Sequence, residues 1–369
     1  MHQLPSLRII DRQESILMAF DKLTTLWEAA CEQSAVSFQM SRIVIVDAHV
    51  LALHKSVLEQ AFPPKSSRYF EVSPGENSKS THMWNRIIDF AFSDTLYRTT
   101  PLIAIGGGVT GDLAGFAAAS LMRGLPLVNI PTTLLAMVDS AIGGKTGINH
   151  TFGKNTIGAF YQPKAVLFDT AFLDTLPQRE WLCGLSEILK YGYIQDPSLL
   201  DDAPQLANGS VRNAGLLRKV IEKSIKIKTA IVSADARETG KRAFLNFGHT
   251  FAHALETLDG YRNINHGEAV YAGMIAALYV SRIKGATVSD QLLKNLRTLY
   301  NLDIRPYAES ADHLVLLMEH DKKNRDRSIQ LVLLKDNGSP YIESIQNRQL
   351  LIDAWNYTFN VLSNRINQG

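Results

Sequence analysis

Cysteine is scarce in this sequence: Cys31 and Cys183 are the only two among 369 residues. Two cysteines so far apart provide neither a disulfide framework nor a CxxC metal site. The N-terminal residues also lack the basic segment followed by an apolar segment that is typical of a secretory signal. These absences favour a reducing compartment, and we expect a cytoplasmic protein.

The sequence also lacks a strong charge imbalance and long hydrophobic runs. Lys and Arg number 38 against 36 Asp and Glu, which leaves a net charge of +2 and no global field to attract nucleic acid or anionic membranes. The longest uninterrupted apolar run lies near residues 269–280, well short of the ~20 residues that cross a bilayer. With 46% hydrophobic and 20% charged residues, the composition is that of an ordinary globular protein. We therefore expect neither a nucleic-acid nor a membrane partner.

The pattern of apolar residues changes near residues 175–180. Before this point, short β-branched runs alternate with helical segments, which predicts a mainly parallel sheet buried on both faces. After it, helical spacing dominates until the run at 329–334. We predict an α/β domain over 1–177 and a mostly α-helical domain over 178–369. The predicted strands are Arg42–Val46, Pro101–Ile105, Leu127–Ile130 and Ala165–Phe168.

A glycine-rich motif, Gly106–Gly111, follows one predicted strand and opens a predicted helix with G-x-G-x-x-G spacing. Such a turn lets a pyrophosphate approach the backbone N–H groups of a helix N-terminus. A tight turn without a ligand is the alternative, because no acidic residue follows about 20 residues later to hold a ribose. Asp47, after an earlier strand, is the candidate for that role. Thr132 and Thr133 at the end of another strand would either cap a helix or contact the nucleotide.

A second glycine-rich stretch covers residues 139–155, and its spacing does not satisfy a Walker A motif. We expect a flexible loop that carries Lys145, Lys154 and the amide of Asn155. Such groups bind phosphate, carboxylate or hydroxyl groups, although loop lysines are more often simply solvated.

Histidines and one glutamate form the strongest chemical signal. His249 and His253 are spaced i, i+4 on one helical face, and His266 follows within the same 18 residues. Glu187 and Lys190, spaced i, i+3, suggest a surface ion pair, but their apolar neighbours indicate partial burial. Glu187 with two of the three histidines would form a metal centre with open positions, and the spacing leaves open which two.

Taken together, these motifs resemble 3-dehydroquinate synthase of the sugar-phosphate cyclase superfamily. The resemblance extends from about residue 42 to about residue 334. It implies an N-terminal α/β nucleotide-binding domain, a helical C-terminal domain, an active site in the cleft and a homodimer. The segments that carry it are Gly106–Asp112, Pro131–Thr133, Asp139–Asn149, Gly153–Phe160, Glu187–Tyr191, Leu245–His253, His266–Ala269 and Asp321–Lys323.

The resemblance implies a role for each matching residue. Glu187, His249 and His266 would bind one divalent metal, zinc or cobalt, although the His249–His266 spacing is one residue longer than in the family. Arg123 would reach the substrate phosphate of a neighbouring subunit. NAD would contact Asp47, Glu76, Lys79, Gly107, Gly108, Val109, Asp112, Thr132, Thr133, Lys154 and Thr175. The substrate would contact Asp139, Lys145, Asn155, Lys190, Lys228, Arg242, Asn246, His253 and one lysine of the Lys322–Lys323 pair, for which we take Lys322.

The implied reaction converts 3-deoxy-D-arabino-heptulosonate 7-phosphate into 3-dehydroquinate and phosphate, a step of the shikimate pathway to aromatic amino acids. NAD would accept a hydride and return it within each turnover. The nearest alternative is a sister cyclase acting on sedoheptulose 7-phosphate or glucose 6-phosphate. A metal-dependent polyol dehydrogenase and an inactive nucleotide-binding module are further alternatives.

Overall fold

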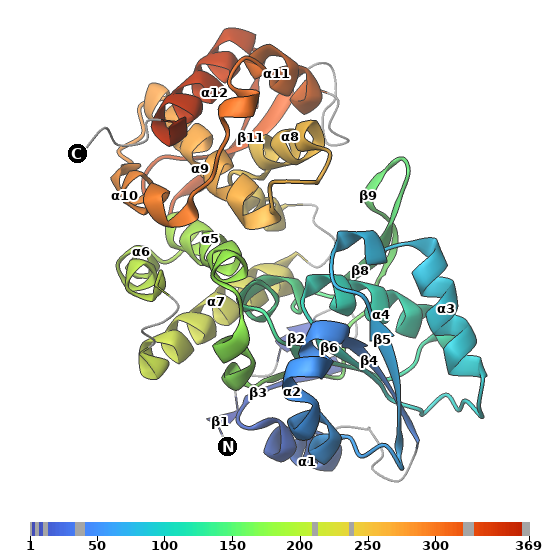
Figure 1. Cartoon of the computed structure of the whole chain (residues 1–369). Helices are drawn as coiled ribbons and strands as arrows, with labels where there is room; N and C mark the ends of the chain where they lie inside the picture. The colour runs from blue at the N-terminus through green and yellow to red at the C-terminus, as the bar shows by residue number, and fades with distance from the viewer. Residues whose placement is uncertain are drawn as a thin grey trace. The chain divides into compact units, whose positions relative to one another are not determined.

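The structure, a computed structural model, describes residues 2–3, 7–9, 14–33, 41–208, 213–235, 240–319 and 328–363. Packing divides the chain into two units (Figure 1). The first comprises Met1–Pro177 and Ile221–Ala236, and the second comprises Gln178–Val220 and Arg237–Gly369. Among the helices of the described residues, none has the length and apolar character needed to span a membrane.

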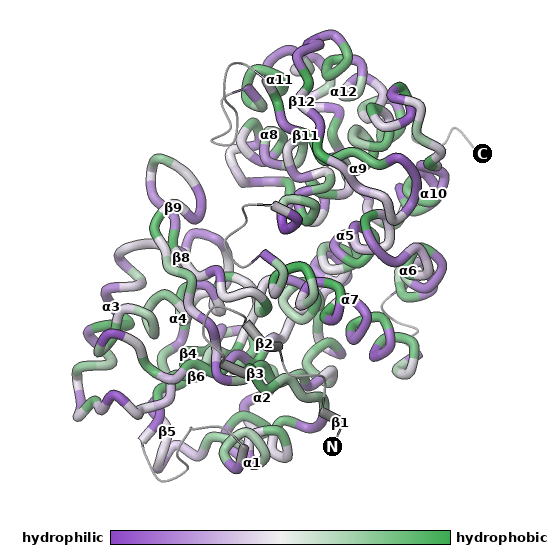
Figure 2. The backbone as a smooth tube through the Cα atoms, turned by 180° about the vertical axis from the view of Figure 1, so that it is seen from behind, coloured by the Kyte–Doolittle hydropathy of each residue, from purple (hydrophilic) through white to green (hydrophobic). Residues whose placement is uncertain are grey.

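A sheet with six parallel strands forms the centre of the first unit. In spatial order these strands are β3 (Glu14–Phe20), β10 (Ala165–Phe168), β7 (Leu127–Pro131), β6 (Leu102–Gly106), β4 (Arg42–Asp47) and β5 (Ser67–Val72). The short strands β1 (His2–Gln3) and β2 (Leu7–Ile9) pair antiparallel with β3. Figure 2 shows the hydrophobic character of β4 and β6, which burial on both faces of a parallel sheet requires.

Alternate side chains of the strands belong to two separate cores. Val44 and Val46 of β4 pack on the face covered by α1 (Leu23–Gln33) and α2 (Ala48–Ala61). Ile43 and Ile45 pack on the opposite face, against α3 (Thr81–Phe92) and α4 (Gly108–Ser120). The predicted α/β fold of the first half is therefore confirmed, and the buried strands leave only their ends available for polar chemistry.

Strand β3 lies in a part of the sequence from which no element was predicted. It pairs with β10, and the ring of Phe20 stacks on that of Phe168 with centroids 4.8 Å apart. The Asp169 carboxylate accepts a hydrogen bond from the Leu23 amide (2.9 Å) and so fixes the start of α1. These contacts give residues 14–33 a structural role within the first unit.

The expectation of a flexible loop over 139–155 was wrong. Asp139 lies within a π-helical turn, η3 (Ala136–Ser140), and the residues from Lys145 onward form an antiparallel hairpin of β8 (Lys145–His150) and β9 (Gly153–Phe160). Two of the glycines are present because the hairpin backbones approach closely: a Cβ on Gly158 would lie 2.2 Å from the Thr146 carbonyl oxygen. A glycine in a strand can mark such an approach rather than mobility.

The second unit is mostly helical, as the sequence predicts. Its helix α9 (His266–Ile283) is buried along almost its whole length and packs against α5, α8 and α12. The antiparallel pair β11 (Ile329–Leu334) and β12 (Pro340–Ile345) lies in the same unit. The other α-helices after residue 177 are α5 (Gln178–Ile194), α6 (Ser198–Asp202), α7 (Ala214–Ala234, which passes from the second unit into the first), α8 (His249–Asp259), α10 (Gln291–Tyr300), α11 (Ala311–Glu319) and α12 (Arg348–Ser363).

Short helical turns connect the longer elements. They are η1 (Glu76–Ser78), η2 (Leu121–Arg123) and η4 (Thr170–Thr175) in the first unit, and η5 (Ala203–Leu206), η6 (Lys241–Asn246) and η7 (Arg305–Tyr307) in the second.

We expect Gly158→Ala to destabilise the protein by about 1–3 kcal/mol, because the new methyl group would overlap backbone atoms of β8. Gly111→Ala is the matched control, since no atom lies within 4 Å of its added Cβ and alanine favours the helix by about 1 kcal/mol. Chemical denaturation of both variants measures the difference. Equal stability of the two variants would contradict the assignment of Gly158 to a close strand approach.

Candidate active site

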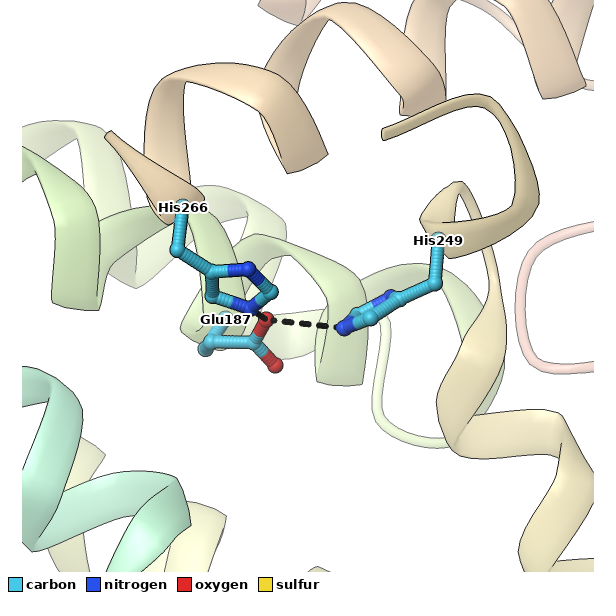
Figure 3. Close-up of side chains that lie close together, drawn as sticks. All are labelled: Glu187, His249 and His266. Atoms are coloured by element: carbon cyan, nitrogen blue, oxygen red, sulfur yellow. Dashed lines mark ion pairs between the residues drawn. The ribbon is translucent and has the colours of Figure 1, made fainter. Parts of the chain in front are cut away.

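Glu187, His249 and His266 lie together in the second unit (Figure 3). Each offers one ligand atom, and these atoms all lie within 4.8 Å of one another. Glu187 Oε1 is 3.5 Å from His249 Nε2 and 3.6 Å from His266 Nε2. The i, i+4 partner of His249 is not part of this cluster, although the ring centroids of His249 and His253 are only 5.8 Å apart.

Glycines at the start of α8 place His249. Gly248 adopts φ +77°, in the left-handed region that favours glycine, and directly precedes the first helical residue. Its carbonyl oxygen would lie 2.1 Å from a Cβ added at Gly273 of α9. The start of α8 therefore packs backbone to backbone on α9, which requires glycine at both positions.

The start of α9, which carries His266, packs in the same way on α5. A Cβ on Gly267 would lie 2.3 Å from the Cα of Cys183, one helical turn before Glu187. The Gly267 amide donates to the Cys183 thiol, and its carbonyl accepts from the Ser186 hydroxyl at 2.8 Å. The residues flanking His266 on α9 and Glu187 on α5 are thus held in direct contact.

A capping box fixes the first turn of α9. The Asn265 side chain accepts from the Glu268 amide, and the Glu268 carboxylate accepts from the Asn265 amide. Arg179 of α5 binds both carboxylate oxygens of Glu268, at 2.7 and 2.6 Å. This arrangement fixes the first turn of α9, where the partly buried His266 is the first helical residue.

Burial keeps the His249 imidazole neutral. Desolvation lowers its pKa to about 3, although the nearby Glu187 carboxylate opposes this effect. Nδ1 lies 3.2 Å from the Phe247 carbonyl oxygen, and donation to that oxygen assigns the proton to Nδ1. The lone pair of Nε2 is then directed toward Glu187.

His266 has the opposite preference. Burial disfavours its charge, but the carboxylates of Glu187 and Glu256 outweigh this effect and raise its pKa to about 10. Glu256 Oε1 lies 3.6 Å from His266 Nδ1. Glu256 was not predicted from the sequence, although it lies seven residues after His249 on one helix and therefore on the same face.

Lys190 completes this cluster, and its pair with Glu187 is fully buried rather than a surface pair. The Lys190 ammonium contacts Glu187 Oε2, while the two imidazoles face Oε1. The exposed fractions of the two side chains are 2% and 1%. A carboxylate oxygen and two imidazole nitrogens form a donor set that suits a divalent transition metal.

The glycine-rich turn between β6 and α4 lines a pocket in the first unit. Gly107, Gly108 and Asp112 line this pocket, as does Lys145. The pocket approaches the N-terminus of α4, where backbone N–H groups have no partner within the helix. A Cβ on Gly108 would lie 3.0 Å from the Ser140 hydroxyl, so glycine keeps this part of the pocket open.

Polar atoms at this pocket lack hydrogen-bond partners. Among the described residues, none bonds to the buried Ser140 hydroxyl or to the side-chain Oδ1 of Asn129, and both residues line the pocket. The Thr132 hydroxyl is likewise buried without a partner, whereas the Thr133 hydroxyl accepts from the Ala136 amide. Buried polar groups normally have partners, so these atoms suit a polar ligand.

Two further predicted cofactor contacts have structural partners. Asp47 caps α2 by accepting from the amides of His49 and Val50, and its Cβ would lie 3.2 Å from a Cβ on Gly106. The Thr175 hydroxyl lies 2.8 Å from His54 Nε2. Val109 is the second residue of α4, and Lys154 is on β9.

Buried charges connect several predicted residues of the first unit. Lys79 is buried and contacts Asp112 (2.6 Å), Glu76 (3.8 Å) and the side chain of Asn155. Burial raises the pKa of Asp112, and the Lys79 ammonium opposes this effect. Lys228 of α7 binds Asp139 at 2.8 Å and is buried, whereas a lone lysine of that kind is usually solvated.

The remaining predicted residues are divided between the two units. Arg242 is buried in η6, Asn246 ends that turn, and His253 follows in α8. Arg123 is exposed in η2 with φ +64°, next to Met122 at φ +51°. Lys322 and Lys323 lie outside the described residues.

Comparison with known proteins identifies the family. The family model described as "3-dehydroquinate synthase N-terminal" matches residues 69–183, and that described as "3-dehydroquinate synthase C-terminal" matches residues 184–324. A 3-dehydroquinate synthase from Salinibacter ruber is 42% identical over 323 residues, which are 85% of this chain and 87% of the relative.

Solved structures of two sugar-phosphate cyclases share the fold. A 2-deoxy-scyllo-inosose synthase complexed with carbaglucose-6-phosphate, NAD+ and Co2+ has a TM-score of 0.79 and 26% identity, covering 96% of this chain and 99% of that one. A 2-epi-5-epi-valiolone synthase from Streptomyces hygroscopicus with NAD+ and Zn2+ has a TM-score of 0.82 and 24% identity, covering 95% and 98%. The matched domains, the relatives and the shared fold agree, and the chain belongs to the 3-dehydroquinate synthase family.

Proposed function

We propose that this protein converts 3-deoxy-D-arabino-heptulosonate 7-phosphate into 3-dehydroquinate and phosphate, using NAD and one divalent metal ion, zinc or cobalt. The observation that carries the proposal is the buried cluster of Glu187, His249, His266 and Lys190. A chain that formed only an inactive module would have no need for three converging metal ligands beside a buried cation.

The donor set of the cluster fits the metal. Glu187 Oε1 and the Nε2 atoms of His249 and His266 would hold it, and three protein ligands leave open positions for a substrate. When bound, the metal would act as a Lewis acid that lowers the pKa of a coordinated alcohol. Glu187 can meet the metal and Lys190 at once, because they use different carboxylate oxygens.

Lys190 has the second role in handling the substrate alcohol. Its ammonium, held by Glu187 in a buried site, would donate a hydrogen bond to the alkoxide that forms during oxidation. His253 on the same helix as His249 would bind substrate and hold a proton nearby. Neither residue needs to move a metal ligand to act.

The pocket at the glycine-rich turn suits the pyrophosphate of NAD. The open backbone at Gly107 and Gly108, the helix N-terminus and the partnerless Ser140 hydroxyl all favour a polar anionic group there. Asp47, Glu76, Lys79, Asp112, Thr132, Thr133, Lys154, Thr175 and Val109 would supply the remaining contacts. When bound, the nicotinamide would accept a hydride from the substrate and return it, so that no net NADH forms.

Cations and amides would bind the two anionic ends of the substrate. Lys145 and Lys228 in the first unit, with Arg242 and one lysine of Lys322–Lys323, provide charge for the carboxylate and the phosphate. Asp139 orients Lys228 through their ion pair. Asn155 and Asn246 would donate or accept hydrogen bonds at substrate hydroxyls.

A homodimer would complete the site through Arg123. The backbone of Met122 and Arg123 adopts φ values of +51° and +64°, which cost non-glycine residues free energy and often accompany function. The Arg123 side chain is exposed on this turn and is available to a phosphate of a second subunit.

Because Cys31 and Cys183 are free thiols, we also propose the cytoplasm as the site of action.

Measured phosphate release distinguishes the proposed substrate from those of sister cyclases. We expect turnover of 3-deoxy-D-arabino-heptulosonate 7-phosphate and none of sedoheptulose 7-phosphate or glucose 6-phosphate. The 42% identity to a 3-dehydroquinate synthase against 26% to an inosose synthase supports this choice. Turnover of only the latter sugars would overturn it, and steady accumulation of NADH with a simple polyol would instead indicate a dehydrogenase.

Glu187→Ala should abolish metal binding and turnover together, because it removes the carboxylate ligand that faces both histidines. Metal content by atomic emission and phosphate release measure the two effects on one sample. Thr250→Ala, on the same helix as His249 but outside the cluster, is the control. Full activity of Glu187→Ala would show that the ligand set is wrong.

Glu256→Gln should weaken metal affinity about 10–100-fold, the effect typical of losing a carboxylate that orients a metal-binding imidazole. Competition with a chelator of known affinity measures the change. Glu222→Gln on α7, outside this cluster, controls for loss of one negative charge. Unchanged metal affinity in the Glu256 variant would exclude the orienting role.

Arg123→Ala should raise the KM for the sugar phosphate at least tenfold while NAD affinity remains unchanged, because only a charged contact to phosphate is lost. Arg98→Ala provides a control at another arginine of the first unit. Steady-state kinetics and NAD titration give the two quantities. An unchanged KM and kcat would remove Arg123 from the site.

A further inference from the structure

Asn149 of β8 forms three hydrogen bonds with residues assigned above to cofactor and substrate. Its side-chain Nδ2 donates to Glu76 Oε1 at 2.8 Å, and its Oδ1 accepts from the Asn155 amide at 2.9 Å. Its own amide donates to the Lys79 carbonyl oxygen, also at 2.8 Å. No motif assigned a role to Asn149, yet it contacts three residues that have one.

Asn155 needs such support because its backbone is strained. It adopts φ +51°, in the left-handed region, where asparagine is one of the few residue types other than glycine that occur. The Asn149 carboxamide holds the Asn155 amide, and the Lys79 ammonium contacts the Asn155 side-chain oxygen. The conformation of Asn155 is thus determined at both ends by its neighbours.

These contacts form a closed ring of four residues in the first unit. Glu76 bonds to Asn149, Asn149 to the amide of Asn155, Asn155 to Lys79, and Lys79 lies 3.8 Å from Glu76. Lys79 is 4% exposed and also binds Asp112, which lines the pocket at the glycine-rich turn. A displacement of any one member therefore changes the surroundings of the others.

We propose that Asn149 is a positioning residue that couples the cofactor-binding segment at Glu76 and Lys79 to the substrate-binding Asn155. This inference rests on the proposed function for the roles of those three residues. Its two side-chain bonds serve different partners: the acceptor oxygen fixes Asn155, and the donor nitrogen fixes Glu76. A change at Asn149 should affect the binding of both ligands through the residues that Asn149 holds.

Two variants separate the two bonds. Asn149→Ala removes both, so we expect NAD affinity to fall about tenfold and the KM for the sugar phosphate to rise by a similar factor. Asn149→Asp keeps the acceptor for Asn155 but places a carboxylate against Glu76, so NAD affinity falls while the KM changes less than twofold. Thr151→Ala, at the exposed turn of the same hairpin, should change neither. Calorimetric NAD titration and steady-state kinetics provide the measurements.

Amide hydrogen exchange of the ligand-free protein tests the ring without the cofactor. The Asn155 amide should exchange at least tenfold faster in Asn149→Ala, and at an unchanged rate in Asn149→Asp and Thr151→Ala. Unchanged exchange and NAD affinity in a folded Asn149→Ala would overturn the proposal. If that variant did not fold, an unchanged NAD affinity in Asn149→Asp would overturn it.

The two hypotheses fail in different ways. Failure of the wild-type protein to bind NAD would refute the proposed function, whereas the exchange of the Asn155 amide would still decide whether Asn149 holds this residue. In another outcome, the wild-type protein binds NAD and turns over normally while Asn149→Ala and Asn149→Asp change NAD affinity and the KM identically. That result would refute the coupling alone.

Discussion

A buried carboxylate that faces cations and imidazoles on two sides organises the second unit. Glu187 is almost completely removed from water, and an isolated carboxylate there would be costly. One oxygen is met by Lys190 and the other by His249 and His266. The helices α5, α8 and α9 must therefore converge at this point, and glycines at Gly248, Gly267 and Gly273 allow their backbones to approach closely enough.

The same environment gives the two imidazoles different properties. His249 is kept neutral by burial and directed by a backbone carbonyl, whereas His266 lies between two carboxylates that favour its charge. Binding of a divalent metal would replace that charge on His266 with a stronger one. The carboxylates of Glu187 and Glu256 thus favour a positive charge at this cluster.

The first unit presents polar groups from a largely apolar sheet. Strands β6, β7 and β4 end at Gly106, Pro131 and Asp47, and the next residues turn away from the core. The helix N-terminus after Gly107 and the partnerless hydroxyl of Ser140 lie at this edge. The hairpin β8–β9 then adds charged and amide side chains, among them Asn149, which lies next to the hairpin turn and contacts Lys79.

The sequence by itself determined the fold class, the change in the pattern of apolar residues near residue 177 and the family. Alternation of buried strands with helices, and later helical spacing alone, depend on local periodicity that a sequence displays directly. The resemblance read from the sequence also named Glu187, His249 and His266, although spacing alone left open which two of the three histidines join Glu187. Tertiary structure decided that His266 rather than His253 lies beside Glu187, because separate helices must be packed before such distances exist. Tertiary structure also decided the β-hairpin over 145–160, because glycine spacing is the same in a loop and in a close strand pair. The pairing of β3 and the contacts of Glu256 and Asn149 were decided in the same way, because contacts between distant segments leave no local pattern in the sequence.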